Sequence, residues 1–349
     1  MNQDSLNCGK RTDHFACGNV CRIITVLLLV LLLSGLAAAY SFVLAAPGEV
    51  TDASNGAAEN GWLSVSGTQL VNQQGQSVVL HGMSSHGLQW FPQYTTSNAI
   101  GATAAYGANL FRIAMYTAEG GYLSHKSSML KQLYKSVDAA IARNMYVIID
   151  WHILSDGNPK KHQKAAKKFF KKVSARYANV PNVIYEICNE PNGKGIWKKI
   201  RSYAKAVIPV IRKNAPSSVI LVGTPTWSQD VDVAAGSPLP YPNLMYSCHF
   251  YAGTHGEWLR GKVKTALDKG LPVFISEWGT SKASGGGGVH TGEADKWISF
   301  MDQNKLSWAN WSYCNKKESS AALSKKADPE DGLAQNELSK SGKYVFSKF

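Results

Sequence analysis

The sequence predicts a single (β/α)8 (TIM) barrel, and three observations lead to this fold class. Eight short apolar segments alternate with helical patterns along most of the 349-residue chain. The alternating region covers about 290 residues, which is within the usual size range of this barrel. Residues suited to chemistry follow the ends of the apolar segments, whereas the starts are apolar. An open doubly wound sheet is the alternative, but no glycine-rich dinucleotide turn follows an early strand.

The expected elements alternate in the order that such a barrel needs. Eight strands, rich in β-branched and aromatic residues, are expected at 78–82, 110–115, 146–151, 183–187, 219–223, 244–250, 272–277 and 307–311. Helices are expected near 97–106, 127–143, 162–178, 196–213, 229–235, 256–269, 290–303 and 335–348. Before the first strand, residues 63–65 and 70–71 predict a small hairpin that could close the bottom of the barrel.

The first 46 residues predict export. A polar stretch ends at Arg22, and the next 24 residues, 23–46, carry no charge. About 20 apolar residues suffice for a helix to cross a bilayer, whereas the small residues before Pro47 are suited to signal cleavage. We expect either secretion or a membrane anchor with the barrel outside, and Arg22 on the cytoplasmic side in both cases. Residues 47–60 are expected to be an unpacked linker, and 61–349 the barrel domain.

The net charge of +13 is concentrated in a few places. The densest basic run, 160–176, has lysines at helical spacing with Phe169, Phe170 and Val173 positioned to face a core. This pattern is typical of a solvated helix face; attraction to an acidic surface, such as a polyanionic cell wall, is the alternative. No zinc-finger spacing, phosphate loop or recognition-helix pattern accompanies the charge, so we do not expect a nucleic-acid partner.

Six cysteines are present, three before the apolar run and three in the barrel domain. Cys188, Cys248 and Cys314 are widely spaced and match no disulfide framework or metal-binding pattern. We interpret them as small buried side chains, with one disulfide possible.

Polar and aromatic residues collect at the ends of the expected strands. These residues are His86, Arg112, Tyr116, Asp150, Trp151, His152, Asn189, Glu190, His249, Tyr251, Glu277, Trp278 and Trp311. Because the carboxyl ends of barrel strands meet at one rim, we expect these side chains to form one site there. Glu190 and Glu277 end two strands and lie 87 positions apart. Two such carboxyl groups are the minimum apparatus for hydrolysing a glycosidic bond, one as acid/base and one as nucleophile.

Taken singly, these residues have less specific interpretations. A lone histidine at a strand end is often structural, Arg112 could hold the rim together, and Trp311 could be core packing. A metal site made of His86, His152 and His249 would draw each ligand from a different strand without local ligand spacing, so we expect no metal.

The sequence Asn310-Trp311-Ser312 matches a glycosylation site. It lies on the expected eighth strand, however, so we expect it to be too buried for modification.

Five sequence blocks resemble the signature blocks of glycoside hydrolase family 5, and they occur in the order of that family. They are Asp150-Trp151-His152, Asn189-Glu190-Pro191, His249-Phe250-Tyr251, Ser276-Glu277-Trp278-Gly279 and the segment 308–323. More narrowly, the blocks resemble the secreted endo-β-1,4-glucanases (cellulases) of bacteria and plant-parasitic nematodes. The resemblance runs from about Trp62 to the C-terminus.

The resemblance implies roles for particular residues. Glu190 would be the acid/base and Glu277 the nucleophile. The supporting positions would be Arg112, His152, Asn189, His249, Tyr251 and Trp311. The residues that line the glycone subsites would be His86, Trp90, Tyr116, Lys316 and Glu318.

We therefore expect retaining, mid-chain hydrolysis of a β-1,4-glucan by a monomeric protein without a cofactor. The like charge of Glu277 would raise the pKa of Glu190, and Arg112 and Tyr251 would keep Glu277 ionised. Asn189 could bond a sugar 2-hydroxyl, and His249 would orient Glu190. β-Mannan, xylan or mixed-linkage glucan are alternative substrates, and a non-catalytic carbohydrate-binding protein is an alternative of another class.

Overall fold

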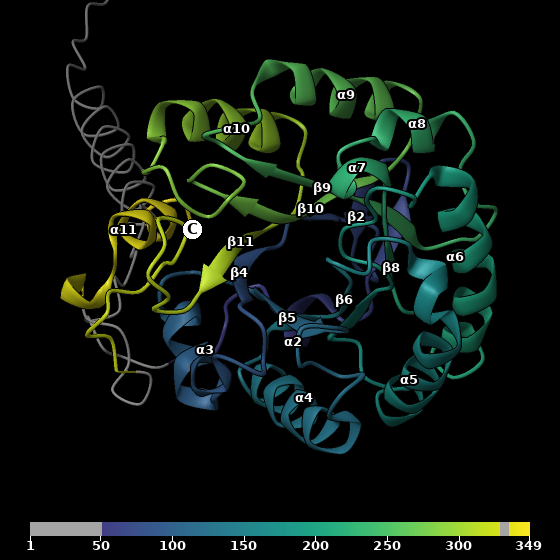
Figure 1. Cartoon of the computed structure of the whole chain (residues 1–349), viewed down its shortest axis with the longest axis horizontal. Coiled ribbons are helices and arrows are strands. Elements are labelled where there is room, and N and C mark those ends of the chain that lie inside the picture. Colours follow the sequence, from purple (N-terminus) through teal and green to yellow (C-terminus); the bar gives the residue numbers. More distant parts are fainter. Residues whose placement is uncertain (1–50, 329–334) are drawn as a thin grey trace, which may run out of the picture. The chain divides into compact units, whose positions relative to one another are not determined.

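The computed structural model describes residues 51–328 and 335–349. Eight parallel strands close into a barrel in chain order, with the last strand beside the first, as Figure 1 shows in a view down the barrel. The strands are β4 (His81–Ser85), β5 (Leu110–Tyr116), β6 (Tyr146–His152), β7 (Val183–Glu186), β8 (Ile220–Gly223), β9 (Leu244–Tyr251), β10 (Val273–Gly279) and β11 (Trp308–Tyr313). The predicted (β/α)8 barrel is confirmed.

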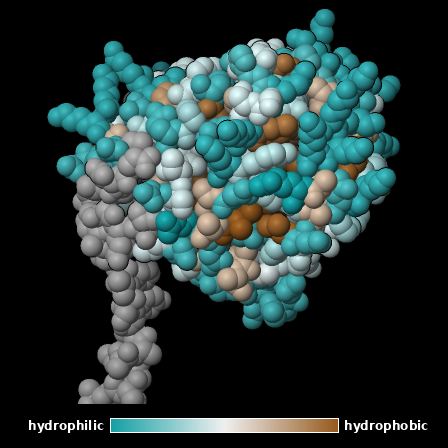
Figure 2. All heavy atoms as spheres, turned by 90° about the horizontal axis from the view of Figure 1, so that it is seen from below, coloured by the Kyte–Doolittle hydropathy of each residue, from teal (hydrophilic) through white to brown (hydrophobic). Residues whose placement is uncertain are grey.

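The helices surround the barrel on its outside (Figure 1). They are α3 (Ser97–Ala105), α4 (Lys126–Ala142), α5 (Gln163–Arg176), α6 (Trp197–Arg212), α8 (Val231–Ala235), α9 (Glu257–Asp268), α10 (Thr291–Gln303) and α11 (Lys340–Phe346). The single turn α7 (Pro225–Ser228) follows β8 and lies inside this ring of helices, and the short 3-10 turns are η1 (Pro92–Thr95), η2 (Pro159–His162) and η3 (Gln335–Glu337). The surface seen in Figure 2 is mostly hydrophilic, with small groups of hydrophobic side chains between.

The barrel strands are buried because helices cover the sheet from outside and side chains fill it from inside. Every residue of β5, β6 and β9 is buried. The covering helices bury one stripe each; in α5, for example, Phe169, Phe170 and Val173 face the strands and the lysines face outward.

The first expected strand, 78–82, combines parts of two elements, and this boundary was wrong. Val78 belongs to β3 (Ser77–Val78), which adds to the hairpin of β1 (Ser64–Ser66) and β2 (Gln69–Val71). The barrel strand begins only at His81 and continues into Ser84 and Ser85. The Ser84 hydroxyl accepts a hydrogen bond from Arg112, and the Ser85 hydroxyl accepts one from the Ala114 amide of β5, so the apolar signal stops where the strand still continues.

The small three-stranded sheet packs below the barrel. Leu63, Leu70 and Val78 share one buried cluster with Leu110 and Tyr146, which begin their strands. The expected position of the hairpin at the bottom of the barrel agrees with this packing.

The described part of the expected linker, residues 51–60, is also packed. Ala53 and Ala57 are buried, and their amides donate to the carbonyls of Arg143 and Asn144. A short helix, α2 (Ala57–Asn60), follows. The expected export segment 1–46 lies outside the described residues. Within residues 51–328 and 335–349, no helix is long and apolar enough to cross a membrane.

Two further elements differ from expectation, and two side-chain predictions are confirmed. The expected helix 229–235 is α8, and a separate turn, α7, precedes it. The expected helix 335–348 is shorter, because only residues 340–346 form α11. Cys188, Cys248 and Cys314 are buried and free, and Asn310 of the possible glycosylation site is fully buried.

Candidate active site

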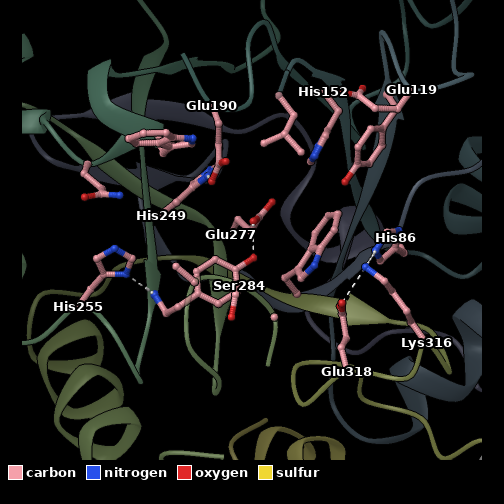
Figure 3. A pocket seen from close by; sticks show the side chains of 18 of the residues that line it. His86, Glu119, His152, Glu190, His249, His255, Glu277, Ser284, Lys316 and Glu318 are labelled. Carbon is pink, nitrogen blue, oxygen red and sulfur yellow. Dashed lines mark hydrogen bonds and ion pairs between the residues drawn. The ribbon is translucent and has the colours of Figure 1, made fainter. Parts of the chain in front are cut away.

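Two carboxyl groups face each other at the C-terminal end of the barrel. Glu277 lies within β10, and Glu190 follows β7 by four residues. One carboxylate oxygen of each, together with a ring nitrogen of His249, lie within 4.8 Å of one another. In Figure 3, Glu190 and His249 lie together, with Glu277 below them. This separation fits the roughly 5–5.5 Å of a retaining glycosidase and is shorter than the roughly 6.5–9.5 Å of an inverting one.

Glu277 is surrounded by groups that favour its ionised form. Nη1 of Arg112 lies 3.0 Å from Oε2, and the Tyr251 hydroxyl donates a 2.7 Å hydrogen bond to Oε1. Burial by itself would raise the pKa of Glu277, but the charges of His249 and Arg112 and the Tyr251 hydrogen bond bring it below the ordinary glutamate value. The expected role of Arg112 and Tyr251 in keeping this carboxylate ionised agrees with the geometry.

The surroundings of Glu190 favour its protonated form. Its pKa is raised, first by burial and then by the like charge of Glu277, although its contact with His249 works against the rise. The expected repulsion from Glu277 is therefore present but is not the largest cause. Nδ1 of His249 lies 3.1 Å from Oε1 of Glu190 and fixes the direction of the carboxyl group. The two carboxyl groups are thus driven toward different protonation states.

His249 connects Glu190 to a buried carboxylate. Its Nε2 lies 2.9 Å from the Ser276 hydroxyl, which donates in turn to Oε1 of Glu186 at 2.6 Å. Burial would lower the pKa of His249, but its contacts with Glu186 and Glu190 and the charge of Glu277 raise it to about 9. His249 therefore carries two N–H donors at neutral pH, one directed to Glu190 and one to Ser276.

The sequence analysis missed Glu186, which anchors this network. It is fully buried in β7, where its Oε2 lies 2.7 Å from Nε of Arg112 and its Oε1 also accepts from Ser247. Burial opposes its ionisation, but Arg112 and His249 hold the pKa of Glu186 well below the ordinary value. A carboxylate inside an otherwise apolar strand was the signal that could have revealed it, because buried charges need partners.

Arg112 lies inside the barrel and not at its rim. Besides Glu277 and Glu186, its Nη2 contacts Oδ2 of Asp150 at 2.9 Å and Oδ1 of Asn189 at 2.6 Å. A guanidinium can only donate, so the contact fixes the orientation of the Asn189 amide. The Asn189 nitrogen then faces Nε2 of His152 at 3.2 Å.

This orientation also assigns the tautomer of His152. Since Nε2 receives the Asn189 amide, Nδ1 holds the proton and donates to Oδ2 of Asp150 at 2.6 Å. Burial and the charge of Arg112 lower the pKa of His152 to about 3, so its ring is neutral. Asn189 is fully buried behind the cavity wall, and its expected bond to a sugar hydroxyl stays a prediction.

A cavity of about 620 Å³ opens over these groups. Eleven of the sequence-predicted residues line it: His86, Trp90, Tyr116, His152, Glu190, His249, Tyr251, Glu277, Trp311, Lys316 and Glu318. Arg112, Asn189 and Asp150 are buried behind the wall. The expectation that Trp151 and Trp278 belong to the site was wrong, because both rings are buried in the hydrophobic core. The wall also contains residues that the sequence analysis missed: Glu119, Leu154, Trp227, Gln229, His255, Ala283, Ser284 and Gly285.

Aromatic rings cluster on one side of Glu277. His86 contacts Tyr116, Trp311 and Trp90, and Trp90 is 46% exposed. Trp311 lines the cavity, so it is not simply core packing, whereas Trp308 on the same strand is buried. Flat apolar rings beside polar groups suit the faces of pyranose rings.

Lys316 adds a polar contact on the same side. Its Nζ lies 2.7 Å from Oε2 of Glu318 and 3.3 Å from Nε2 of His86, as the dashed lines in Figure 3 show. Burial and the charge of Lys316 lower the pKa of His86 to about 3, so this ring is neutral.

Trp227 lies on the opposite side, next to the loop that carries Glu190. Thr226, Trp227 and Ser228 all have positive φ, a left-handed turn that costs roughly 1–2 kcal/mol per residue. Hydrogen bonds hold it: the Trp227 amide donates to the Pro191 carbonyl, and the Ser228 hydroxyl donates to the Asn189 carbonyl. The turn presents an indole that is 46% exposed. Three consecutive left-handed residues leave no pattern in a sequence, so only a tryptophan after the fifth strand could have suggested this wall.

Gly279 makes room for Tyr251. The two residues pair across β10 and β9, and a side chain at Gly279 would overlap the Tyr251 ring. The missing side chain lets the ring lie against β10, where its hydroxyl reaches Glu277.

Glu190, His249 and Glu277 could also ligate a metal ion by distance alone. Two of the three are already engaged with positive charge. Glu277 is paired with Arg112, and the ring of His249 is itself protonated. The donor set therefore fits acid/base chemistry better than coordination of a cation. The three histidines considered from the sequence do not form such a cluster among the described residues.

A parallel barrel with two carboxyl groups at this spacing and opposed pKa shifts is the frame of a retaining glycosidase. Comparison with known proteins agrees: the model of the family "Cellulase (glycosyl hydrolase family 5)" matches residues 71–317. The chain belongs to glycosyl hydrolase family 5.

Similar proteins come from bacteria. The chain is 49% identical over 287 residues to an endoglucanase of Clostridium saccharobutylicum, covering 82% of this chain and 64% of the relative. It is 52% identical over 277 residues to endoglucanase A of Evansella cellulosilytica, covering 78% and 57%. The solved catalytic domain of an endoglucanase from Thermobifida fusca superposes with a TM-score of 0.79 at 37% identity, covering 84% of this chain and 98% of that one. The chain thus spans about three fifths of the length of these two curated relatives.

Proposed function

We propose that this protein is an endo-β-1,4-glucanase that hydrolyses cellulose and related β-glucans with retention of the anomeric configuration. The observation that carries the proposal is the Glu190–Glu277 pair, with oxygens within 4.8 Å and pKa values displaced in opposite directions. Membership of family 5 and the names of the relatives support the substrate class. A related solved structure is a complex with cellotetraose.

In the first step, Glu277 attacks the anomeric carbon while Glu190 gives its proton to the glycosidic oxygen. The bond to the leaving sugar breaks, and a glycosyl ester forms on Glu277. In the second step, the now ionised Glu190 removes a proton from water, the water oxygen attacks the anomeric carbon, and Glu277 leaves as a carboxylate. Each residue ends in its starting state.

The surrounding groups would serve these steps. His249 fixes Oε1 of Glu190 and so leaves the other oxygen to hold the transferred proton. Arg112 and Tyr251 hold Glu277 in its ionised form and aim it. Trp311, Trp90 and Tyr116 would receive sugars on the glycone side, with Lys316 and Glu318 binding hydroxyls. Trp227, beside the acid/base loop, would receive the leaving sugar.

The test is release of reducing ends from carboxymethylcellulose, glucomannan, xylan and mixed-linkage glucan by the full chain, with Glu277→Gln as the control. We expect strong activity on carboxymethylcellulose, a rapid fall in viscosity, and no activity in the control. Activity mainly on mannan, xylan or mixed-linkage glucan would keep the mechanism and replace the substrate. If the unaltered chain has no activity on any of these substrates, the proposal is contradicted and a carbohydrate-binding protein is favoured.

We also propose that the barrel acts outside the cell, as a secreted or membrane-anchored domain. The uncharged run 23–46 after Arg22 supports this proposal. N-terminal sequencing of the mature protein and extraction of membranes with alkaline carbonate distinguish the two forms. Recovery of the full-length chain in the cytosol would contradict both.

A further inference from the structure

The net positive charge of the chain comes from one segment. Residues 157–229 contain 15 lysines and arginines against Glu186 and Glu190, a difference of 13, whereas the rest of the chain contains 22 residues of each sign. Both glutamates are buried in the candidate active site. The outer surface built by this segment therefore carries basic charge without any acidic residue of its own.

The structure places this charge on one side of the barrel. In Figure 1, α5 and α6 lie next to each other, and Asn214 joins them by donating to Ser174. We call the outward-facing basic residues of η2, α5, α6 and the 191–196 loop the basic face. They are Lys160, Lys161, Lys164, Lys167, Lys168, Lys171, Lys172, Lys194, Lys198, Lys199, Arg201 and Lys205.

The basic face is not neutralised by neighbouring elements. Among the described residues, no carboxylate forms an ion pair with any member of the basic face. Elsewhere in this segment, outside the active site, Arg176 contacts Asp138 and His162 lies 3.8 Å from Asp156. Arg212 is also occupied, because it donates to the carbonyls of Ser218 and Pro242. A surface selected for solubility alone would usually mix both signs of charge.

The positions of these lysines do not favour the fold. The first turns of α5 and α6 contain no acidic residue and instead hold Lys164, Lys198 and Lys199, where the helix dipole disfavours a cation. Lysines four positions apart, such as Lys164 and Lys168, also repel each other on the same side of α5. Because the arrangement costs stability, we look for its purpose in binding.

A groove lies between the two helices. It has a volume of about 390 Å³ and is lined by Gln163, Lys164, Lys167, Lys168, Lys171 and Val210. Four ammonium groups along one groove match an extended polymer with regularly spaced negative charges better than a single small anion.

The side-chain types indicate which polymer fits. Eleven of the twelve basic residues are lysines, which act as point charges, whereas phosphate recognition favours the arginine fork. Apart from Trp227, which lines the cavity of the candidate active site, the aromatic rings of the segment, such as Phe169, Phe170 and Tyr203, are buried and cannot stack on bases. Ile196 is the only large apolar side chain exposed near the basic face in the described structure, so membrane insertion has little support.

We propose that the basic face binds an acidic polysaccharide whose charges are carboxylates, that is, a polymer of uronic acids. The groove between α5 and α6 holds the chain, and the lysines of η2 and the 191–196 loop extend the contact toward the rim that holds Glu190. This binding is separate from the proposed hydrolysis and does not depend on it.

The test is binding of the full chain to soluble polygalacturonate, measured by affinity electrophoresis and by titration at 50 and 300 mM NaCl, with dextran as the neutral control. We expect binding to polygalacturonate alone, weakened on the order of tenfold or more by the higher salt. A variant with Lys164→Gln, Lys167→Gln, Lys168→Gln and Lys171→Gln should lose at least tenfold in affinity. The matched control changes four exposed lysines elsewhere to glutamine: Lys126, Lys131, Lys135 and Lys305.

Both quadruple variants should cleave a short neutral cello-oligosaccharide normally, and Glu277→Gln should still bind polygalacturonate. This separation distinguishes failure of the binding proposal from failure of the proposed enzymatic function. Equal weakening in the two quadruple variants would overturn the assignment to the basic face. Absence of binding, or tighter binding to duplex DNA or phosphatidylserine vesicles at the same salt, would overturn the choice of partner.

Discussion

The hydroxyl of Tyr251 donates a hydrogen bond of 2.7 Å to Oε1 of Glu277, from a ring that lies against Gly279. Hydrogen bonds to charged groups contribute roughly 1.5–3 kcal/mol, so Tyr251→Phe should lower kcat about 10- to 100-fold. The same change should raise the pKa of Glu277, because the hydrogen bond favours the carboxylate. Steady-state kinetics across pH measures both effects.

Tyr146→Phe is the matched control for that variant. It removes a hydroxyl from another buried ring, which donates to the Gly61 carbonyl below the barrel, far from Glu277. Equal losses of activity in the two variants would show that the effect comes from general loosening of the fold.

Glu190 and Glu277 should be separable by the quality of the leaving group. Glu190→Gln removes the proton donor, so cleavage of cello-oligosaccharides should fall by roughly 10²–10⁴-fold. Formation of the glycosyl ester from an aryl cellobioside with an acidic phenol should be much less affected, because that phenolate leaves without a proton. Glu277→Gln should abolish both reactions. Pre-steady-state bursts of phenol measure the first step, and a burst in Glu277→Gln would contradict the assignment.

The activity should have a bell-shaped pH dependence. It should rise as Glu277 ionises, below the ordinary glutamate pKa, and fall as Glu190 loses its proton, above that value. The cation of His249 lowers the pKa of both groups. In His249→Gln both limbs of the profile should therefore move to higher pH, in addition to a loss of rate.

His81→Gln is the control for that shift. The pKa of His81 is lowered to about 4 by burial, so the residue is neutral in the working range and its replacement removes no charge. If only the acidic or only the alkaline limb of the pH–activity profile moves in His249→Gln, this histidine acts on one carboxyl group alone.

Glu186 should matter for stability as well as for the site. Glu186→Ala leaves Arg112 buried with one carboxylate fewer, and removing one partner of a buried ion pair costs about 3–5 kcal/mol. The free energy of unfolding from urea titrations at neutral pH measures this loss. Because the pKa of Glu186 is depressed, its contribution is present above the ordinary glutamate pKa and is lost as pH falls. A destabilisation that persists unchanged in strong acid would contradict the electrostatic explanation.

The rule that strand ends carry the chemistry explains how much of the site could be predicted from the sequence. Glu190, His249 and Tyr251 follow or end apolar runs, and the barrel brings them together as expected. Glu186 escaped because the strand was expected to continue to Ile187, so its charge was placed within the strand, whereas it is the last residue of β7. Trp227 escaped for a different reason: its position depends on left-handed backbone angles that hydrogen bonds to another loop enforce. Contacts between distant segments decide such positions, and local periodicity cannot show them.

The turn at Trp227 has a consequence for how substrate preference can change. The Trp227 amide and the Ser228 hydroxyl donate hydrogen bonds to the carbonyls of Pro191 and Asn189, the two neighbours of Glu190. Trp227, the proposed platform for the departing sugar, and Glu190, the proposed proton donor, are therefore held together by these hydrogen bonds. A substitution that changes how Trp227 binds a sugar will also move the carboxyl group of Glu190 and its proton. Chain-length preference and leaving-group chemistry are therefore expected to evolve together at this loop. The opposite side, around Trp90 and Lys316, has no direct hydrogen bond to Glu190 or its two neighbours among the described residues and is freer to diversify.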